Sequence, residues 1–186
     1  NYLDVTSFPG TTDEQIASAI DSAKGTDHKT VYFPNGDYYL KESIRLNDAD
    51  VEINFLGESD EDTRLYSAPI IIEGSNNQLC LGPMFNFDIA GGFERFFVTV
   101  KNFTLDFSLA IQDSIFTEGG CSTSGHGVRV GNGWETGQLT LDSLRILYAP
   151  GYGIGIQNGR DGDIAADNLV MTNIFVYHSG MDGLDT

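Results

Sequence analysis

The strongest constraint on this sequence is a segment that recurs 30 residues further along the chain. Leu139–Ile146 (LTLDSLRI) aligns with Leu169–Val176 (LVMTNIFV). Each copy continues through a short polar turn into a Gly-containing strand, GYGIGI at 151–156 and MDGLDT at 181–186. A period of this length, carried by short strands of alternating polarity, indicates stacked repeats rather than a single globular weave.

The repeat has earlier copies in the chain. Val98–Leu105 fits the template of Leu139–Ile146, 41 residues before it, and HGVRV at 126–130 matches the strand that follows the turn. The alternation of apolar residues breaks and resumes around Asp142-Ser143, as expected where a strand turns a corner. Three short strands and three turns per coil of roughly 20–30 residues predict an all-β fold, a right-handed parallel β-helix.

The organisation expected from this pattern is a single domain over residues 1–186, with an entry and capping helix in 1–28 and coils in 29–186. Thr186 falls inside a strand, so we expect the chain to be the N-terminal part of a longer solenoid. No helical pattern separates the repeats, which argues against βαβ units. A β-sandwich is the rival fold, although it would require hairpin turns and no fixed period.

One amphipathic helix is predicted, from Asp13 to Lys24. Thr12 is the expected N-cap, Gln15 completes a capping box, and Gly25 is the expected stop. The apolar residues at helical spacing form one face that we expect to cover the open end of the first coil; they are Ile16, Ala19, Ile20 and Ala23. Further along, Ile70-Ile-Ile72 is predicted as a core strand.

The composition narrows the class of partner. The formal net charge is −17, from 27 acidic and 10 basic residues, which argues against nucleic acid because phosphate binding requires clustered Lys and Arg. The charge suits solubility in a salty or extracellular medium and does not exclude an acidic polysaccharide. No apolar run is long enough for a membrane span. Cys80 and Cys121 either form a disulfide or are two core thiols.

The segment after the helix carries a family resemblance. TVYFPNGDYYL at 30–40, followed by Ile44-Arg-Leu46 and a strand ending at Gly57, resembles the opening of the pectate-lyase-like β-helix superfamily. Phage tailspike depolymerases, polygalacturonases, fungal β-1,3-glucanases and mannuronan epimerases belong to it. The family's Gly-Asp-Gly run before the helix is shortened here to Pro9-Gly10-Thr11-Thr12-Asp13. The resemblance implies the β-helix fold and a polysaccharide partner.

Chemistry is expected at the outward positions of the stacked strands. Val128 and Val130 point inward, so Arg129 points outward, and the same alternation turns Gly155 and Asp185 outward. These three residues are therefore predicted to form a column, in which Arg129 and Asp185 lie about 10 Å apart.

The last strand resembles a catalytic motif. MDGLDT is similar to the Asn-Thr-Asp-Gly-Ile-Asp motif of polygalacturonases, which places Asp182 on its first, catalytic Asp and Asp185 on the Asp after it; the chain departs at Gly180-Met181. The candidate catalytic residues are therefore Asp182, Asp185 and His178. The candidate substrate-binding residues are Arg129, His126 and Arg160. An ordinary Asp-Gly turn is the alternative for Asp182, and turn hydrogen bonding is the alternative for the histidines.

Two further patterns can be compared with sites of the superfamily. GYG at 151–153 resembles mannuronan epimerases, but their following Asp-Pro-His-Glu is replaced by Gly155-Ile-Gln-Asn158. Asp161, Asp163 and Asp167 would suit calcium, as lyases of the superfamily use it, although their spacing is not that of an EF-hand loop. A solvated turn is the alternative there, and no other metal or cofactor is expected.

Two functions remain open from the sequence. The first is an extracellular polysaccharide-degrading β-helix enzyme, a glycoside hydrolase rather than a lyase, which is either secreted or part of a phage tailspike and then a homotrimer. The second is a non-catalytic β-helix that binds glycans or builds a virion or extracellular fibre. An enzyme needs convergent carboxylates in one groove, whereas a binder needs aromatic platforms.

Overall fold

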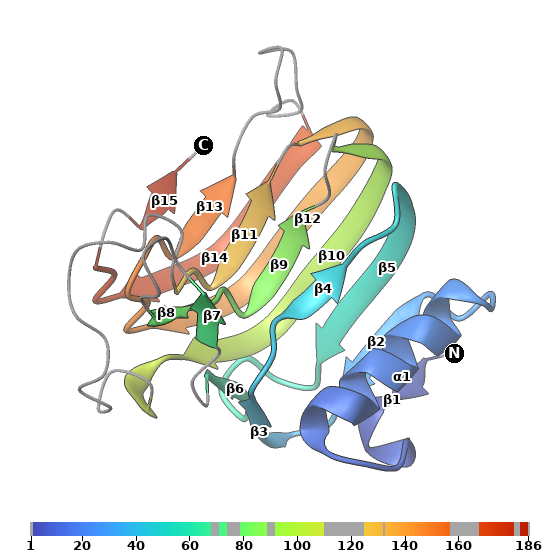
Figure 1. Cartoon of the computed structure of the whole chain (residues 1–186), viewed down its shortest axis with the longest axis horizontal. Helices are drawn as coiled ribbons and strands as arrows, with labels where there is room; N and C mark the ends of the chain where they lie inside the picture. The colour runs from blue at the N-terminus through green and yellow to red at the C-terminus, as the bar shows by residue number, and fades with distance from the viewer. Residues whose placement is uncertain are drawn as a thin grey trace.

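The computed structural model of the chain describes residues 2–67, 71–73, 79–88, 92–109, 125–131, 133–156, 168–180 and 183–185. Strands make up most of the described chain (Figure 1). The elements are β1 (Leu3–Asp4), η1 (Val5–Ser7), α1 (Thr12–Lys24), β2 (Thr30–Phe33), β3 (Gly36–Leu40), β4 (Ile44–Leu46), β5 (Asp50–Gly57), β6 (Thr63–Ser67), β7 (Ile71–Glu73), β8 (Leu79–Leu81), β9 (Phe85–Asp88), β10 (Phe93–Asp106), β11 (Val128–Gly131), β12 (Trp134–Leu147), β13 (Ile154–Ile156), β14 (Leu169–Tyr177) and β15 (Leu184–Asp185).

Most strands of the described chain form two parallel sheets. Sheet A has eight strands and follows the order β1-β2-β5-β10-β12-β14, with β3 and β6 off this path. Sheet B has five strands in the order β15-β13-β11-β9-β4. In Figure 1 the strands of sheet B lie in front of β10, β12 and β14. Parallel pairing in both sheets contradicts the rival β-sandwich, which needs antiparallel hairpins.

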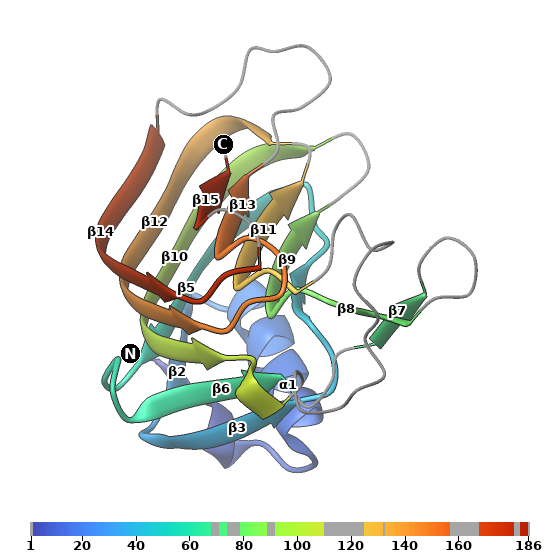
Figure 2. The same cartoon turned by 90° about the vertical axis from the view of Figure 1, so that its left-hand side faces the viewer.

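The register confirms the predicted repeat. Leu139 pairs with Leu169 and Leu141 with Met171, and Val98 pairs with Leu139 one coil earlier. The strands β10, β12 and β14 also bend, so that the first part of β10 pairs with β5 and its last part pairs with β6. The chain therefore visits three faces in turn, the two parts of sheet A and then sheet B (Figure 2). This arrangement is consistent with a parallel β-helix.

The corner of the repeat lies where the alternation breaks. Asn102, Ser143 and Asn173 hold equivalent places in β10, β12 and β14, and all have left-handed backbone, with φ of 62°, 52° and 54°. Asn and Ser tolerate this conformation better than branched residues do, because their short polar side chains find partners nearby. The side-chain amide of Asn102, for example, donates to the carbonyl of Gly57 in an earlier coil (3.2 Å).

An aromatic core fills the space between the sheets. Neighbouring rings from different strands lie within about 6 Å of one another, as in the pairs Phe55–Phe85, Phe85–Phe103 and Phe96–Trp134. These side chains are fully buried. Burial of this aromatic surface stabilises the stack, since each large side chain contributes about 1.5–3 kcal/mol.

The helix α1 confirms the predicted apolar face but not the predicted cap. It begins at Thr12, one residue earlier than expected, with Thr11 as N-cap. The carboxylate of Glu14, not Gln15, accepts from the Thr11 N–H (2.8 Å) and hydroxyl (3.0 Å), and these bonds lower the pKa of Glu14. Gln15 instead donates to the carbonyl of Phe8. The error arose because Thr11 and Thr12 are both good caps, and the charged acceptor selects between them.

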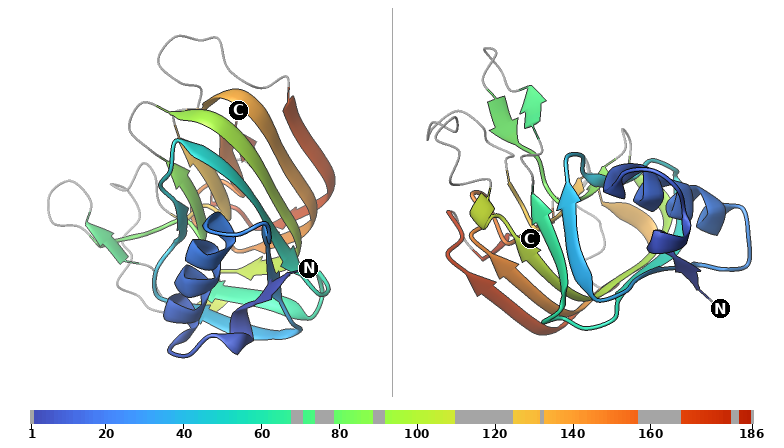
Figure 3. Two further views of the ribbon diagram at one scale, coloured as in Figure 1. Left: turned by 90° about the vertical axis from the view of Figure 1, so that its right-hand side faces the viewer. Right: turned by 90° about the horizontal axis from the view of Figure 1, so that it is seen from below.

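The helix packs at one end of the stack. Its face of Ile16, Ala19, Ile20 and Ala23 is buried in the common core, and its last residue is followed by Gly25 as predicted. Figure 3 shows α1 at the end opposite β14. Within the described ranges, no helix is long and apolar enough to cross a membrane.

The prediction of a core strand at Ile70–Ile72 is confirmed in part, because a strand forms there but lies outside both parallel sheets. Ile71–Glu73 forms β7, which pairs antiparallel with β8 in a separate two-stranded sheet rather than joining either parallel sheet. In Figure 2 these two strands project away from the stack. An apolar run alone predicts a strand but does not indicate which sheet the strand joins.

Candidate functional site

One row of residues crosses sheet B on the side away from the core. The strands β4, β9, β11 and β13 each bury the residues on either side of one central position. The register aligns these central positions, and β15 adds Asp185 beside Gly155. We call this set the outward row; it consists of Arg45, Asn86, Arg129, Gly155 and Asp185. The predicted column of Arg129, Gly155 and Asp185 is confirmed as a register, and Arg45 and Asn86 extend it.

The centre of the outward row is an ion pair. The guanidinium of Arg129 donates to Oδ2 of Asp88 (2.7 Å) and to Oδ1 of Asn86 (3.2 Å), both on the neighbouring strand β9. The Arg129 side chain is only 15% exposed. A guanidinium held this way is preorganised, because little rotational freedom remains to be lost when it meets a ligand.

The predicted binding residue His126 lies beneath the surface beside this row. It is 4% exposed, its Nδ1 accepts from the Tyr152 N–H (2.9 Å), and its ring stacks on that of Tyr152. The Tyr152 carbonyl oxygen lies 3.3 Å from the same Nδ1, so both backbone polar groups of Tyr152 meet this nitrogen. A Cβ added at Gly155 would lie 3.7 Å from this Nδ1, so His126 borders the row at that point.

The predicted residue His178 belongs to a different cluster. Its ring stacks on Tyr148 and meets Tyr177 edge-on, and no described contact joins it to Arg129 or His126. Phe175 and Tyr177 are 50% and 44% exposed, and Arg145 lies 5.7 Å over the Phe175 ring. We call Tyr148, Phe175, Tyr177 and His178 the β14 aromatic cluster. Its position was visible in the sequence, since Phe175 and Tyr177 alternate with the inward Ile174 and Val176.

Of the remaining predicted site residues, only Asp185 lies in the described part of the chain. The backbone of Asp185 pairs with Gly155 as predicted, while its side chain is not described. Asp182, Arg160 and the three aspartates suggested for calcium, Asp161, Asp163 and Asp167, lie outside the described residues, as does Cys121. Among the residues that are described, no group of three His, Cys, Asp or Glu side chains could hold a metal ion.

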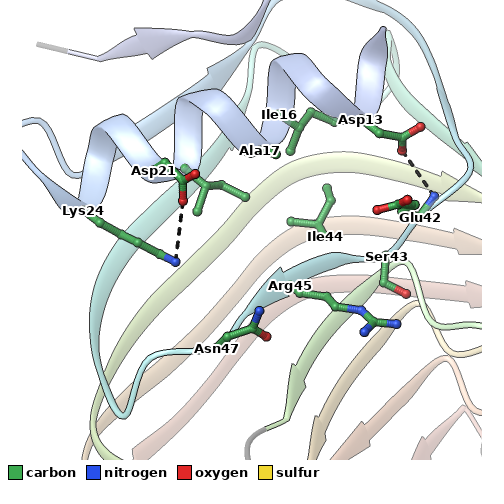
Figure 4. Close-up of a pocket in the computed structure, with 11 residues that line it drawn as sticks. Asp13, Ile16, Ala17, Asp21, Lys24, Glu42, Ser43, Ile44, Arg45 and Asn47 are labelled. Carbon is green, nitrogen blue, oxygen red and sulfur yellow. Dashed lines mark hydrogen bonds and ion pairs between the residues drawn. The ribbon is translucent and has the colours of Figure 1, made fainter.

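A cleft of about 240 Å³ opens beside the first strand of the row. Helix α1 forms one wall and the segment around β4 the other (Figure 4). Arg45, Ser43 and Asn47 lie on the β4 side. Sequence reasoning missed this part of the site, although Ile44-Arg45-Leu46 shows the same inward–outward–inward alternation as Val128-Arg129-Val130.

Comparison with known proteins identifies the family. The family model described as rhamnogalacturonase A/epimerase, pectate lyase-like, matches residues 10–186. Searches of curated proteins and of solved structures gave no match. The matched range covers α1, sheet B with the outward row, and every strand of sheet A except β1. The chain therefore belongs to the pectate lyase-like family of rhamnogalacturonase A and epimerases.

Proposed function

We propose that this chain binds a polysaccharide along the outward row and cleaves it, by hydrolysis rather than elimination. Membership of a pectate lyase-like family indicates a protein that acts on polysaccharides. The observation that carries the proposal is the register that aligns Arg45, Asn86, Arg129 and Asp185 across neighbouring strands. Successive strands are about 4.8 Å apart, so the row offers one contact point per strand to an extended chain of sugars.

The residues have distinct roles in this proposal. Asp182 acts as general acid or base, Asp185 is its carboxylate partner, and His178 completes the set. Glycoside hydrolysis needs one carboxyl group that is protonated and one that is ionised, and repulsion between two close carboxylates raises the pKa of one of them. Arg129, oriented by Asp88, positions the sugar by charge-assisted hydrogen bonds. His126 and Arg160 assist binding.

We also propose the overall fold, the location and the assembly of the protein. The parallel coils form a right-handed solenoid whose open end is covered by α1, as the burial of the α1 apolar face in the common core supports. The protein works outside the cell, either secreted or on a virion, and assembles as a homotrimer if it belongs to a tailspike. Its net charge of −17 suits such a medium and disfavours nucleic acid as a partner.

The test is an assay of the parent chain on a panel of acidic and neutral polysaccharides. The variants Asp182→Asn and Asp185→Asn should each lose about a hundredfold or more in rate while staying folded. Asp37→Asn, at an exposed position on β3, is the matched control and should cleave like the parent. Parent-like cleavage by both site variants would show that these aspartates are turn residues.

A non-catalytic glycan-binding or structural β-helix is the second candidate, and the β14 aromatic cluster favours it. Exposed Phe175 and Tyr177 have nearly parallel rings, 7° apart, and such rings can stack on the apolar faces of sugars. This candidate replaces the first if the parent chain binds glycan without cleaving it and if Tyr177→Ala abolishes the binding.

A further inference from the structure

We propose that the cleft between α1 and β4 binds a single neutral hexose unit. The proposal rests on the proposed function, since it assumes that the chain acts on polysaccharides, and it adds a subsite for a terminal sugar. Figure 4 shows the two walls that face one another, with Ile16 and Ala17 on α1 and Ser43 and Arg45 on the opposite side.

The α1 wall supplies a small apolar surface, of which Ala17 is the exposed part, because Ile16 and Ile20 are only 3% and 5% exposed. Ile16, Ala17 and Ile20 line this side of the cleft, and Ile44 adds an apolar group from β4. A pyranose ring has an apolar face of C–H groups and a rim of hydroxyls, so it suits a cleft with one apolar wall and one polar wall. The volume of about 240 Å³ is below the range of about 300–1,000 Å³ typical of drug-sized ligands, which limits the occupant to one ring.

The β4 wall supplies backbone groups. β4 is the edge strand of sheet B and pairs only with β9 in the described part of the chain. The N–H of Ile44 donates to the carbonyl of Met84 (2.8 Å) beside β9. Because backbone groups alternate in direction along a parallel strand, the N–H and C=O of Arg45 point to the other edge, towards α1. The cleft therefore offers one backbone donor and one backbone acceptor.

A buried hydroxyl also lines the cleft. Ser43 is 9% exposed, and its Oγ forms no hydrogen bond with any residue that the structure describes. A buried polar atom without a partner costs about 1–3 kcal/mol. A sugar hydroxyl can both donate to and accept from this oxygen, so a rotation of the Ser43 side chain towards a bound hexose would remove that cost.

The charges of the cleft favour a neutral ligand. The carboxylate of Asp13 accepts from the N–H groups of Lys41 and Glu42, and Lys24 pairs with Asp48 at 2.6 Å. The side chains of Glu42 and Arg45 form no ion pair or hydrogen bond with any residue that the structure describes, and their two charges cancel. Together they offer an acceptor and a donor to hydroxyl groups. The charged side chains that line the cleft are three acidic and two basic ones, Asp13, Asp21, Glu42, Lys24 and Arg45. The lining therefore carries one net negative charge, which disfavours a sugar carboxylate.

The location links this cleft to the outward row. Arg45 is both a wall of the cleft and the last member of the row on the α1 side. Arg129 lies two strands away, at about 10 Å. A polysaccharide that lies along the row would therefore place its terminal sugar in the cleft, because α1 leaves no room for a further sugar beyond it.

The experiment is a titration of the ¹⁵N-labelled chain with D-galactose, D-glucose, D-mannose, L-rhamnose and D-galacturonic acid, followed by amide shifts in NMR spectra. At least one neutral sugar should shift the amides of 16–20 and 43–47. Arg45→Gln and Ser43→Ala should each weaken that binding by about tenfold. Arg95→Gln, a half-exposed arginine on sheet A, is the matched control and should bind like the parent.

The proposal is overturned if no neutral sugar shifts these amides, if only galacturonic acid does, or if Arg45→Gln binds as the parent does. Its failure is distinguishable from that of the proposed function. Asp185→Asn should leave hexose binding in the cleft unchanged, while cleavage of polysaccharide is lost. If the cleft binds hexose and both Asp182→Asn and Asp185→Asn cleave normally, only the assignment of these two aspartates as catalytic residues is contradicted.

Discussion

At the residue scale, Asp142 connects three successive coils. Its Oδ2 pairs with Lys101 of β10 (2.7 Å), and its Oδ1 accepts from the Thr172 hydroxyl (2.7 Å) and the Asn173 amide (3.1 Å) of β14. These bonds, led by that from Lys101, hold the pKa of Asp142 well below its usual range. The carboxylate at this corner therefore stabilises the stack of coils, not a single turn.

We expect Asp142→Ala to lower the free energy of unfolding by about 1.5–3 kcal/mol at pH 7, the contribution of hydrogen bonds to a charged group. Because the pKa of Asp142 is lowered in the folded state, this stabilisation is present above about pH 4 and is lost as the pH falls further. Thermal unfolding of parent and variant from pH 7 to pH 2 measures it. Asp50→Ala, at a longer and exposed ion pair with Arg95, should change stability by less than about 1 kcal/mol.

Substitution by alanine should have opposite effects on stability at two glycines, Gly137 and Gly25. Gly137 has a φ of 145°, and a Cβ there would overlap the backbone of Phe96 on the neighbouring strand. Gly137→Ala should therefore cost on the order of 1–3 kcal/mol. Gly25 has right-handed backbone, with no atom closer than 3.7 Å to an added Cβ, so Gly25→Ala should be neutral or stabilise by about 0.4–1 kcal/mol. Equal melting temperatures for the two variants would contradict this difference.

At the element scale, the periodicity predicted the long strands well and the connections poorly. The repeat and its corner appear in β10, β12 and β14 at the expected residues, because burial of every second side chain imposes the pattern directly. The cap of α1 and the pairing of β7 with β8 depend on competition between nearly equal local alternatives, which the sequence pattern does not rank. The N-cap of α1 is one such case, because Thr11 and Glu14 form it, each one residue before the predicted Thr12 and Gln15.

The central strand β12 provides the element-scale prediction. Leu144 is fully buried between Phe103 and Ile174 of the neighbouring coils, so Leu144→Ala should cost about 2–5 kcal/mol in urea unfolding. Thr140, on the outward side of the same strand, is only half-buried, and Thr140→Ala should stay within about 0.5 kcal/mol of the parent. A reversed order of these two costs would show that the assigned inward and outward faces are exchanged.

At the scale of the whole molecule, the outward row joins residues from distant parts of the chain. The column of Arg129, Gly155 and Asp185 was predictable, because its strands carry the visible repeat. The ion pair of Arg129 with Asp88 was not, since β9 lies about 40 residues earlier in a stretch without an evident repeat. Arg45 was missed for the same reason, and with it the cleft against α1.

Gly155 allows the most direct test of the central claim that polysaccharide lies along the outward row. A Cβ at Gly155 would make only ordinary contacts, the nearest at 3.7 Å, so Gly155→Ala should fold and act as the parent does. Gly155→Leu fills the middle of the row, and we expect it to weaken polysaccharide binding by roughly tenfold or more, measured by calorimetry beside the melting temperatures of both variants. A folded Gly155→Leu variant that binds polysaccharide as tightly as the parent would contradict the assignment of the row as the binding surface.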